Sequence, residues 1–208
     1  MFRYSCWFVL LLISGSVHAQ GYKEVQDLEK VKAALKKSSD AAQSVSADFQ
    51  EEKHLAVFKE PQKSSGVFYY QKNDKMRWEQ KEPARYVILI NGVKMRVQEA
   101  GKEKNVGQAG RMAAQIKELM IGLVNGDFQE NKAFSQQFQE NNNSYMVTLT
   151  PIQKRLKNVY KKIDLVFLKS TMRLRELTFY QKDGDKSIMK FSNEKINKPI
   201  QESVFTTL

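Results

Sequence analysis

The sequence is poor in cysteine and histidine. It has one Cys and two His among 208 residues, and Cys6 and His18 both lie in an N-terminal segment that we expect to be removed. Losing them excludes a disulfide framework, a thiolate nucleophile and a cysteine–zinc site. A Ser–His–Asp triad would have to use His54, which lies in the polar stretch 51–54 with no nucleophile signature nearby. We therefore expect no enzymatic activity, no metal and no cofactor.

The N-terminal segment has the three parts of a secretory signal peptide. Arg3 supplies a positive start, residues 6–13 are apolar, and Val17-His18-Ala19 places small residues where a signal peptidase reads them. The apolar run is far below the ~20 residues that cross a bilayer, although a short membrane anchor is the alternative. Gln20, not Cys, follows Ala19, so no lipid anchor is expected. Residues 1–19 are thus predicted to be a signal peptide.

The remaining residues, 20–208, predict one domain that carries a net charge of +10, because the segment removes Arg3 and no acid from the total of +11. They contain no internal repeat and no domain linker. Apolar spacing predicts helices over 22–43 and 111–124. Residues 100–110 are expected to be a loop, and 129–143 a polar loop or short helix. Alternation with a period of two predicts about nine strands, at 45–50, 67–71, 75–80, 86–90, 93–98, 144–150, 159–168, 172–181 and 186–193.

Several of these strands are apolar on both sides, which is unusual for a sheet with one solvated face. The runs 67–70, 86–90 and 165–168 are continuously apolar or aromatic. Short turns between successive strands predict an antiparallel sheet, and both of its faces need cover. Two interpretations stay open at this point. The core is completely packed, or a hydrophobic cavity lies under a helical lid at 111–124, whose Met112 and Met120 suit an adaptable surface.

One ordered set of motifs spans residues 66–92. Gly66 opens an aromatic strand that runs to a basic residue at Lys72, then come Met76-Arg77-Trp78, Pro83, and the hairpin signal at the end of 87–92. The order and spacing resemble the LolA family of periplasmic lipoprotein carriers. The similarity is tight over 45–92, loose over 100–144, and returns in the segments 145–151 and 197–205.

The resemblance implies a mainly β fold with helices: an unclosed, strongly curved antiparallel sheet, or half-barrel, with a helical lid over a hydrophobic cavity for acyl chains. It implies a monomeric carrier in the periplasm of a Gram-negative bacterium. The implied partners are acylated lipoproteins, an inner-membrane lipoprotein-releasing transporter, and an outer-membrane receptor or membrane surface, with no nucleic acid. The alternative is an envelope lipid-binding sensor or regulatory module of the same fold that does not transport.

The resemblance also assigns roles to residues. Lys72 takes the place of the family's basic residue that is tied to lid opening, but Lys72-Asn73 replaces the usual Arg-Pro and loses the planar guanidinium fork. Met76 replaces an aromatic residue. The residues expected near the cavity or on its lid are Phe68, Tyr70, Met76, Trp78, Ile88, Ile90, Met95, Val97, Met120, Leu123, Val147, Leu149, Leu165 and Phe167.

Basic residues are densest at Lys154, Arg155, Lys157, Lys161 and Lys162, with no acid between them. Three interpretations stay open. The run is a solvated loop, a docking surface for an acidic transporter, receptor or anionic lipid, or a nucleic-acid site with interleaved aromatics. Export and the family resemblance disfavour the last.

Overall fold

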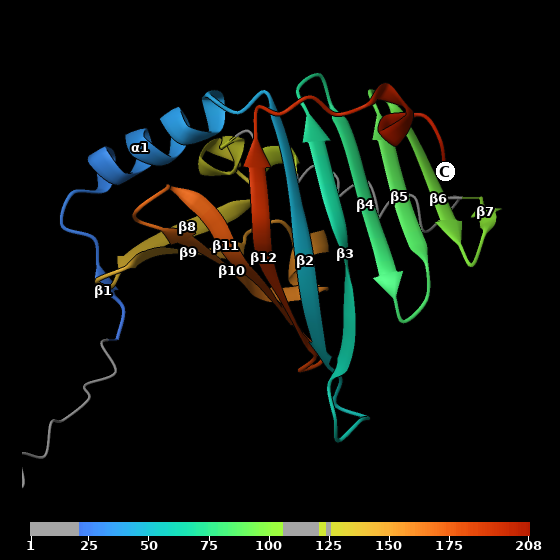
Figure 1. The fold of residues 1–208 in the computed structure, drawn as a ribbon. Helices are drawn as coiled ribbons and strands as arrows, with labels where there is room; N and C mark the ends of the chain where they lie inside the picture. The colour runs from blue at the N-terminus through green and yellow to red at the C-terminus, as the bar shows by residue number, and fades with distance from the viewer. Residues whose placement is uncertain (1–20, 106–120, 124–125) are drawn as a thin grey trace, which may run out of the picture.

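A computed structural model describes residues 21–105, 121–123 and 126–208 (Figure 1). Within these residues the helical elements are α1 (Leu28–Asp40), α3 (Lys154–Lys157) and the 3₁₀ turns η1 (Asp127–Glu130) and η2 (Glu202–Phe205). The strands are β1 (Lys23–Glu24), β2 (Ser44–His54), β3 (Gln62–Gln71), β4 (Lys75–Glu82), β5 (Tyr86–Asn91), β6 (Lys94–Glu99), β7 (Lys102–Lys104), β8 (Phe134–Glu140), β9 (Ser144–Pro151), β10 (Tyr160–Leu168), β11 (Arg173–Gln181) and β12 (Lys186–Ile196).

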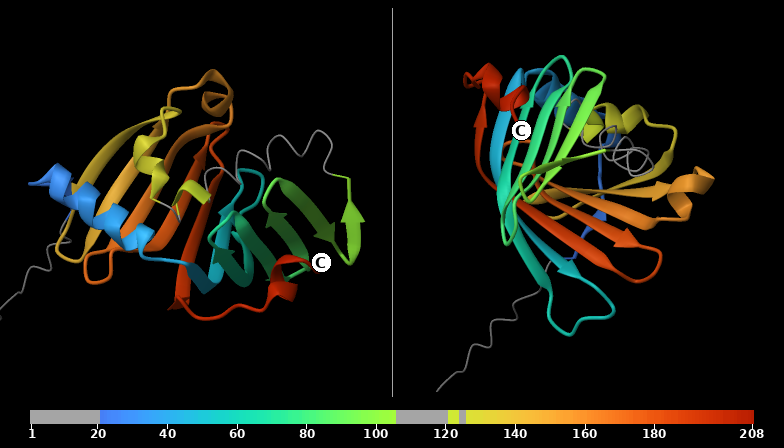
Figure 2. Two further views of the ribbon diagram at one scale, coloured as in Figure 1. Left: turned by 90° about the horizontal axis from the view of Figure 1, so that it is seen from above. Right: turned by 90° about the vertical axis from the view of Figure 1, so that its right-hand side faces the viewer.

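These strands form one antiparallel sheet in the order β1-β8-β9-β10-β11-β12-β2-β3-β4-β5-β6-β7. β1 and β7 lie at its two edges, so the sheet does not close on itself. It curves strongly, and the half built from β8–β11 turns to face the half built from β2–β6 (Figures 1 and 2). The predicted class, a mainly β fold with an unclosed, curved antiparallel sheet, is confirmed.

The hairpins between β3 and β6 follow from local sequence. Turn residues Asn73 and Asp74 adopt positive φ angles of 73° and 57°, as short polar side chains tolerate. The predicted β5–β6 hairpin is confirmed, but its turn is Gly92-Val93, because Asn91 pairs with Lys94. Gly92 supplies the positive φ of 59° that the tight turn needs.

The helix predicted over 22–43 is wrong at its start, because Lys23–Glu24 pairs with β8 as an edge strand. The helix begins at Leu28, where the Asp27 carboxylate accepts a hydrogen bond from the Lys30 backbone N–H at 3.0 Å. This N-cap satisfies one of the first-turn donors. Val31 and Leu35 are then the buried residues of α1.

The prediction of a loop or short helix over 129–143 is wrong in its middle, because Phe134–Glu140 is the strand β8. Phe134 and Phe138 point into the core, as every second residue of a strand can. Between them, the Gln136 amide donates hydrogen bonds to the Phe128 and Gln129 carbonyls of η1, at 2.7 and 2.9 Å. The expected loop over 100–110 is also wrong in part, since it contains the short strand β7. With β1, β7 and β8, the described residues form twelve strands, where nine were expected.

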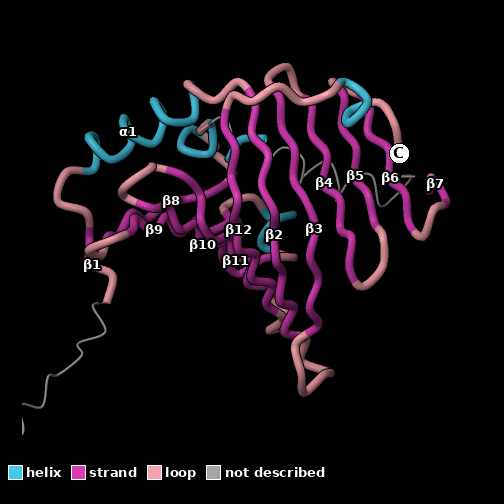
Figure 3. Tube along the Cα trace, viewed as in Figure 1, coloured by secondary structure: helices cyan, strands magenta, loops and turns pink. Residues whose placement is uncertain are grey.

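The main core lies on the concave face and takes alternate residues from each long strand. Val45, Ala47 and Phe49 of β2 show the pattern, and all are at most 6% exposed. η1 covers part of this face, with Phe128 stacked on Phe167 of β10 at a centroid distance of 5.7 Å. In the tube trace, α1 and η2 lie at the same end of the strands (Figure 3).

The convex face of β4 and β5 is covered by the C-terminal turn η2. Val87 and Leu89 are buried there, together with Phe205 of η2. The Arg77 guanidinium donates to the Val204 and Thr207 carbonyls, at 3.2 and 2.6 Å, and holds the turn in place. The apolar run 86–90 therefore has both faces covered, and η2, not one of the two predicted helices, covers the convex one.

The signal peptide predicted over 1–19 lies outside the described residues, as does most of the lid helix predicted over 111–124. Residues 121–123 are helical. Among the described residues, no helix combines the length and apolarity that a membrane crossing requires.

Candidate functional site

Two cavities lie along the concave face. The larger has a volume of about 390 Å³ and is bordered by strands from both halves of the sheet. Its lining residues are Glu51, Lys53, Met76, Trp78, Gln80, Tyr86, Ile88, Val159, Tyr160, Phe179, Gln181, Ser187 and Met189. The apolar members lie on the inner faces of β4, β5, β11 and β12, and the polar members lie near one end of the strands. The cavity is therefore apolar along its walls and polar at one rim.

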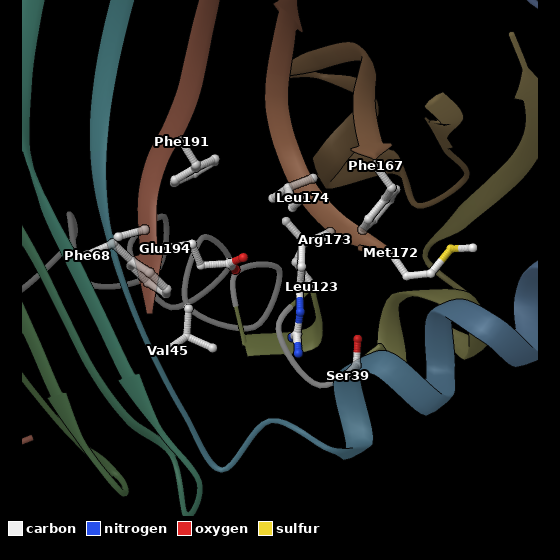
Figure 4. Close-up of a pocket in the computed structure, with 11 residues that line it drawn as sticks. Ser39, Val45, Phe68, Leu123, Phe167, Met172, Arg173, Leu174, Phe191 and Glu194 are labelled. Carbon is white, nitrogen blue, oxygen red and sulfur yellow. The ribbon is translucent and has the colours of Figure 1, made fainter. Parts of the chain in front are cut away.

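The smaller cavity has a volume of about 60 Å³ and lies beside α1 (Figure 4). It is lined by Ser39, Val45, Ala47, Phe68, Leu123, Phe167, Met172, Arg173, Leu174, Phe191 and Glu194. Leu123 comes from the described end of the predicted lid segment and is buried. This cavity is thus formed by the sheet, the end of α1 and residue 123 together.

A cluster of four aromatic side chains joins the two linings. The Trp78 ring stacks on Phe49 with a centroid distance of 3.9 Å, and lies 6.1 Å from Phe68 and 6.5 Å from Phe191. Phe68 and Phe191 line the smaller cavity and Trp78 the larger. The close approach of Phe49 depends on Gly66, where a Cβ atom would come within 2.8 Å of the Phe49 ring and 2.0 Å of the Glu79 carbonyl oxygen.

A buried carboxylate lies at the polar rim of the larger cavity. Glu51 is 4% exposed, and its two oxygens accept hydrogen bonds from the hydroxyls of Ser187, at 2.5 Å, and Ser64, at 2.9 Å. The Lys53 ammonium lies 3.3 Å from the same carboxylate. Burial of a carboxylate is tolerated where such partners replace water. The Lys53 ammonium offsets the charge of Glu51, so the pair gives the cavity a polar edge with little net charge.

Two charged residues border the smaller cavity. A bulge in β12 between Ser192 and Lys195 turns Glu194 toward the interior, and Arg173 reaches the same space from the start of β11 (Figure 4). Part of Glu194 is exposed, but its carboxyl is desolvated. That desolvation raises the pKa of Glu194, and the positive charge of Arg173 opposes the rise only in part.

Lys72 lies in the β3–β4 turn and contacts the end of α1. Its ammonium donates a hydrogen bond to the Asp40 carbonyl at 2.8 Å, and the Asn197 amide donates to the Ala41 carbonyl at 2.9 Å. The last carbonyls of a helix lack partners within the helix and carry partial negative charge. Lys72 therefore ties the C-terminus of α1 to the sheet.

The residues predicted for the cavity fall into three groups. Six line one of the two cavities: Phe68, Met76, Trp78, Ile88, Leu123 and Phe167. Seven line neither cavity: Tyr70, Ile90, Met95, Val147, Leu149 and Leu165 belong to the adjoining core or pack against it, and Val97 is buried on β6 opposite Ile88. Met120 lies outside the described residues. Ligand contact by any of them stays a prediction.

The prediction missed the contribution of β11 and β12. Phe179, Met189 and Phe191 line the cavities from these two strands. Alternation in the sequence could have found them, since Leu177 and Phe179 differ by two positions, as do Met189 and Phe191. The pairing of β12 with β2, which brings them opposite Trp78, links residues more than 130 positions apart and is not visible in local sequence.

The chain was compared with known proteins. A family model described as outer membrane lipoprotein carrier protein LolA matches residues 40–207. No curated protein matches the chain. Similar solved structures include a LolA-superfamily protein from Nitrosomonas europaea, with 15% identity, a TM-score of 0.44, and coverage of 85% of this chain and 97% of that chain.

LprF from Mycobacterium bovis is also similar, with 13% identity, a TM-score of 0.41, and coverage of 83% of this chain and 94% of that chain. MucB in the MucA/MucB complex from Pseudomonas aeruginosa has 13% identity and a TM-score of 0.43, and the match covers 84% of this chain and 60% of that chain. The family match itself extends from the last residue of α1 to the penultimate residue of the chain.

Proposed function

The chain belongs to the LolA family of outer membrane lipoprotein carrier proteins, and on that premise we propose that it carries acylated lipoproteins through the periplasm from the inner to the outer membrane. The acyl chains lie in the groove on the concave face. The partners are an inner-membrane lipoprotein-releasing transporter and an outer-membrane receptor or membrane surface. The larger cavity is the observation that carries this proposal.

The size and lining of that cavity suit a hydrocarbon chain. Its volume of about 390 Å³ falls within the range of roughly 300–1,000 Å³ that is usual for small-molecule sites. If a methylene occupies the same ~30 Å³ as a water molecule, the cavity has room for on the order of a dozen methylenes. Met76 and Met189 are flexible walls that adapt to a chain of irregular conformation.

The energetics of a carrier also fit a groove of this kind. Each methylene that leaves water contributes roughly 0.8 kcal/mol, so a dozen contribute about 10 kcal/mol. A lipoprotein without a carrier would not leave its membrane at that cost. The carrier must offset most of the cost and still release its cargo, which favours a partly open cavity over a sealed one. The larger cavity is partly open, and Glu51 and Lys53 lie on its polar rim.

Lys72 and α1 supply the moving part in this proposal. The charge-assisted hydrogen bond between Lys72 and the Asp40 carbonyl helps to hold the helix end, together with the bond from Asn197 to the Ala41 carbonyl, and each bond is weak enough to break when a ligand displaces the helix end. We propose that Lys72 controls access to the groove from the α1 end.

The test is uptake of an acyl ligand and release of a lipoprotein by the chain 20–208. Trp78 is the one Trp of that chain, and its ring forms part of the cavity wall. We expect its emission to shift when a fatty-acyl ligand binds, and native mass spectrometry to show bound lipid. In a second assay, the protein should release a labelled lipoprotein from inner-membrane vesicles that contain the transporter.

A matched pair of variants locates the site. Met189→Glu places a charge in the larger cavity and should weaken acyl binding at least tenfold, because a buried unpaired carboxylate costs several kcal/mol. Val93→Glu makes the same change at a hairpin position that is 96% exposed and should bind normally. Acyl binding without lipoprotein release would favour the sensor or regulatory module over the carrier. If saturating acyl ligand leaves Trp78 unchanged and no lipid is bound, both are excluded.

A further inference from the structure

Five basic side chains gather near the end of the strands where the polar rim of the larger cavity lies. Lys154, Arg155 and Lys157 belong to α3, Lys161 to β10, and Lys182 to the turn between β11 and β12. All five are exposed. α3 projects from the end of the sheet (Figure 2), so its exposed basic residues lie at the outer edge of the molecule.

Three of these lysines surround a shallow depression of about 340 Å³. Its lining consists of Thr150, Pro151, Lys157, Tyr160, Lys161 and Lys182. Tyr160 also lines the larger cavity, so the depression and the acyl groove share a wall. The backbone N–H of Lys182 donates to the Val159 carbonyl at 3.0 Å, which holds the turn beside the start of β10.

Within the described part of the chain, none of the five basic residues forms an ion pair. Asp164, which is close to Lys161 in the sequence, accepts hydrogen bonds from Lys162 and Thr148, at 2.6 and 2.7 Å. In the β11–β12 turn, Asp183 accepts from the Asp185 backbone N–H at 3.1 Å and keeps its charge beside Lys182. The five cations outnumber this acid, so the cluster keeps a net positive charge that an anionic partner can meet.

An exposed apolar side chain lies next to the cluster. Ile152 follows the end of β9 and is 52% exposed, while its backbone N–H is fixed by a 2.7 Å hydrogen bond to the Ala133 carbonyl. Leu156 buries the inner side of α3 and so keeps the basic residues of that helix on the outside. An exposed apolar side chain just before a basic helical turn matches a lipid interface, where headgroups are anionic and the layer beneath them is apolar.

We propose that this basic cluster, with Ile152, docks the open end of the groove on an anionic membrane surface. The lysines contact lipid phosphates, Ile152 inserts below them, and the shared wall at Tyr160 places the larger cavity next to the bilayer. The proposal builds on acyl binding in the groove and adds where that groove meets the membrane. A cavity that opens toward lipid lets an acyl chain pass between bilayer and protein with little exposure to water.

The experiment measures binding of the chain 20–208 to vesicles, one set of pure phosphatidylcholine and one with an equal amount of phosphatidylglycerol. The test variant carries Lys157→Gln, Lys161→Gln and Lys182→Gln. The control variant carries the same change at Lys94, Lys102 and Lys198, which are exposed elsewhere on the molecule. Each basic residue near an anionic surface contributes roughly a factor of five to partitioning. The test variant should therefore bind the mixed vesicles about 100-fold more weakly than the wild type, and the control should lose little.

Ile152 is tested separately. Ile152→Ser should weaken binding to the mixed vesicles, and Ile152→Trp should show a blue shift in emission that brominated lipids quench. Raising the salt concentration should weaken binding of the wild type, because mobile ions screen the lysines.

Each outcome decides the proposal. Equal binding of the wild type to both kinds of vesicle, or equal losses in the test and control variants, would overturn it. The proposal would also be overturned if the wild type bound inorganic phosphate or an acidic protein but did not bind the mixed vesicles. The acyl-induced shift of Trp78, measured in solution, should be unchanged in the lysine variants. Vesicle binding without that shift would refute the groove and leave the docking surface standing.

Discussion

Phe205 offers a direct test of how the apolar strands are covered. Its ring is 0% exposed and lies on the convex face with Val87 and Leu89, on the opposite side of the sheet from the acyl groove. η2 is held there by Arg77 and by an ion pair between Lys75 and Glu202 at 2.7 Å. Replacing Phe205 by Ala removes the ring and keeps these polar contacts, so it isolates the contribution of the apolar cover.

The expected loss is large for one side chain. Truncation of a fully buried Phe to Ala costs about 3–5 kcal/mol, from lost transfer free energy and the cavity that remains. A domain of this size has a total unfolding free energy of about 5–15 kcal/mol. With a shift of roughly 2–4 °C per kcal/mol, the melting temperature should fall by about 10 °C.

The assay is thermal unfolding followed by circular dichroism, with Ser203→Ala in the same turn as the control. Ser203 is exposed, and its substitution should change the melting temperature by no more than about 1–2 °C. Acyl binding by Phe205→Ala, measured well below its melting temperature, should match the wild type because the groove is on the other face. If Phe205→Ala melts like Ser203→Ala, η2 does not stabilise the sheet and the account of the apolar run 86–90 is wrong.

Two further predictions concern charged residues. Burial raises the pKa of Glu79, but hydrogen bonds from Arg77 and Arg85, at 2.7 and 3.0 Å, outweigh it and hold the pKa below its usual value of 4.5. A carboxyl group whose pKa is lower in the folded than in the unfolded state stabilises the fold at pH values above the unfolded pKa. That stabilisation is lost as the pH falls through the folded pKa. Glu79→Gln should therefore cost about 1–3 kcal/mol at neutral pH, and urea unfolding should show that difference shrinking below about pH 4. Lys72→Met removes the donor to Asp40 and should speed both hydrogen exchange in α1 and acyl release roughly fivefold. Lys72→Arg keeps a donor and should restore both rates. Unchanged acyl release in Lys72→Met would exclude a lid role for Lys72.

The sequence predicted best the elements that local pattern determines. The hairpins of β3–β4 and β5–β6 combine alternating apolar residues with turn residues that accept positive φ. Period two divides the side chains of a strand between two faces, but several of these strands are apolar on both, so the pattern alone does not decide that Met76, Trp78 and Ile88 lie on the cavity side. Gly66 was recognised as part of a motif, and the structure supplies its physical reason: Phe49 and the Glu79 carbonyl leave no room for a Cβ atom.

What the sequence could not show depends on contacts between distant segments. The composition of β8 is typical of a loop, and its strand state follows from pairing with β9 and from Gln136 bonding to η1. η2 is a four-residue turn with no strong pattern, yet Phe205 completes the cover of β5 from over 100 positions away. In both cases contacts with distant segments override a weak local conformational preference.

The two cavities together restrict how a long acyl chain can be held. In the proposed function the larger one has room for about a dozen methylenes and shares Tyr160 with the depression beside the basic cluster, while the smaller one, at about 60 Å³, has room for about two. The rings of Trp78 and Phe68 lie between them, and the smaller cavity ends at Ser39 of α1. A chain that exceeds the first space must therefore displace the aromatic cluster or α1 before it gains further burial. Since each added methylene contributes roughly 0.8 kcal/mol and the Lys72 bond about 1–3 kcal/mol, two to four methylenes beyond the larger cavity are enough to offset that bond at the C-terminal end of α1, while the buried side chains of Val31 and Leu35 keep the helix on the sheet. The length of the acyl chain and the position of the C-terminal end of α1 are then coupled, and the free energies involved are small enough to allow the cargo to leave.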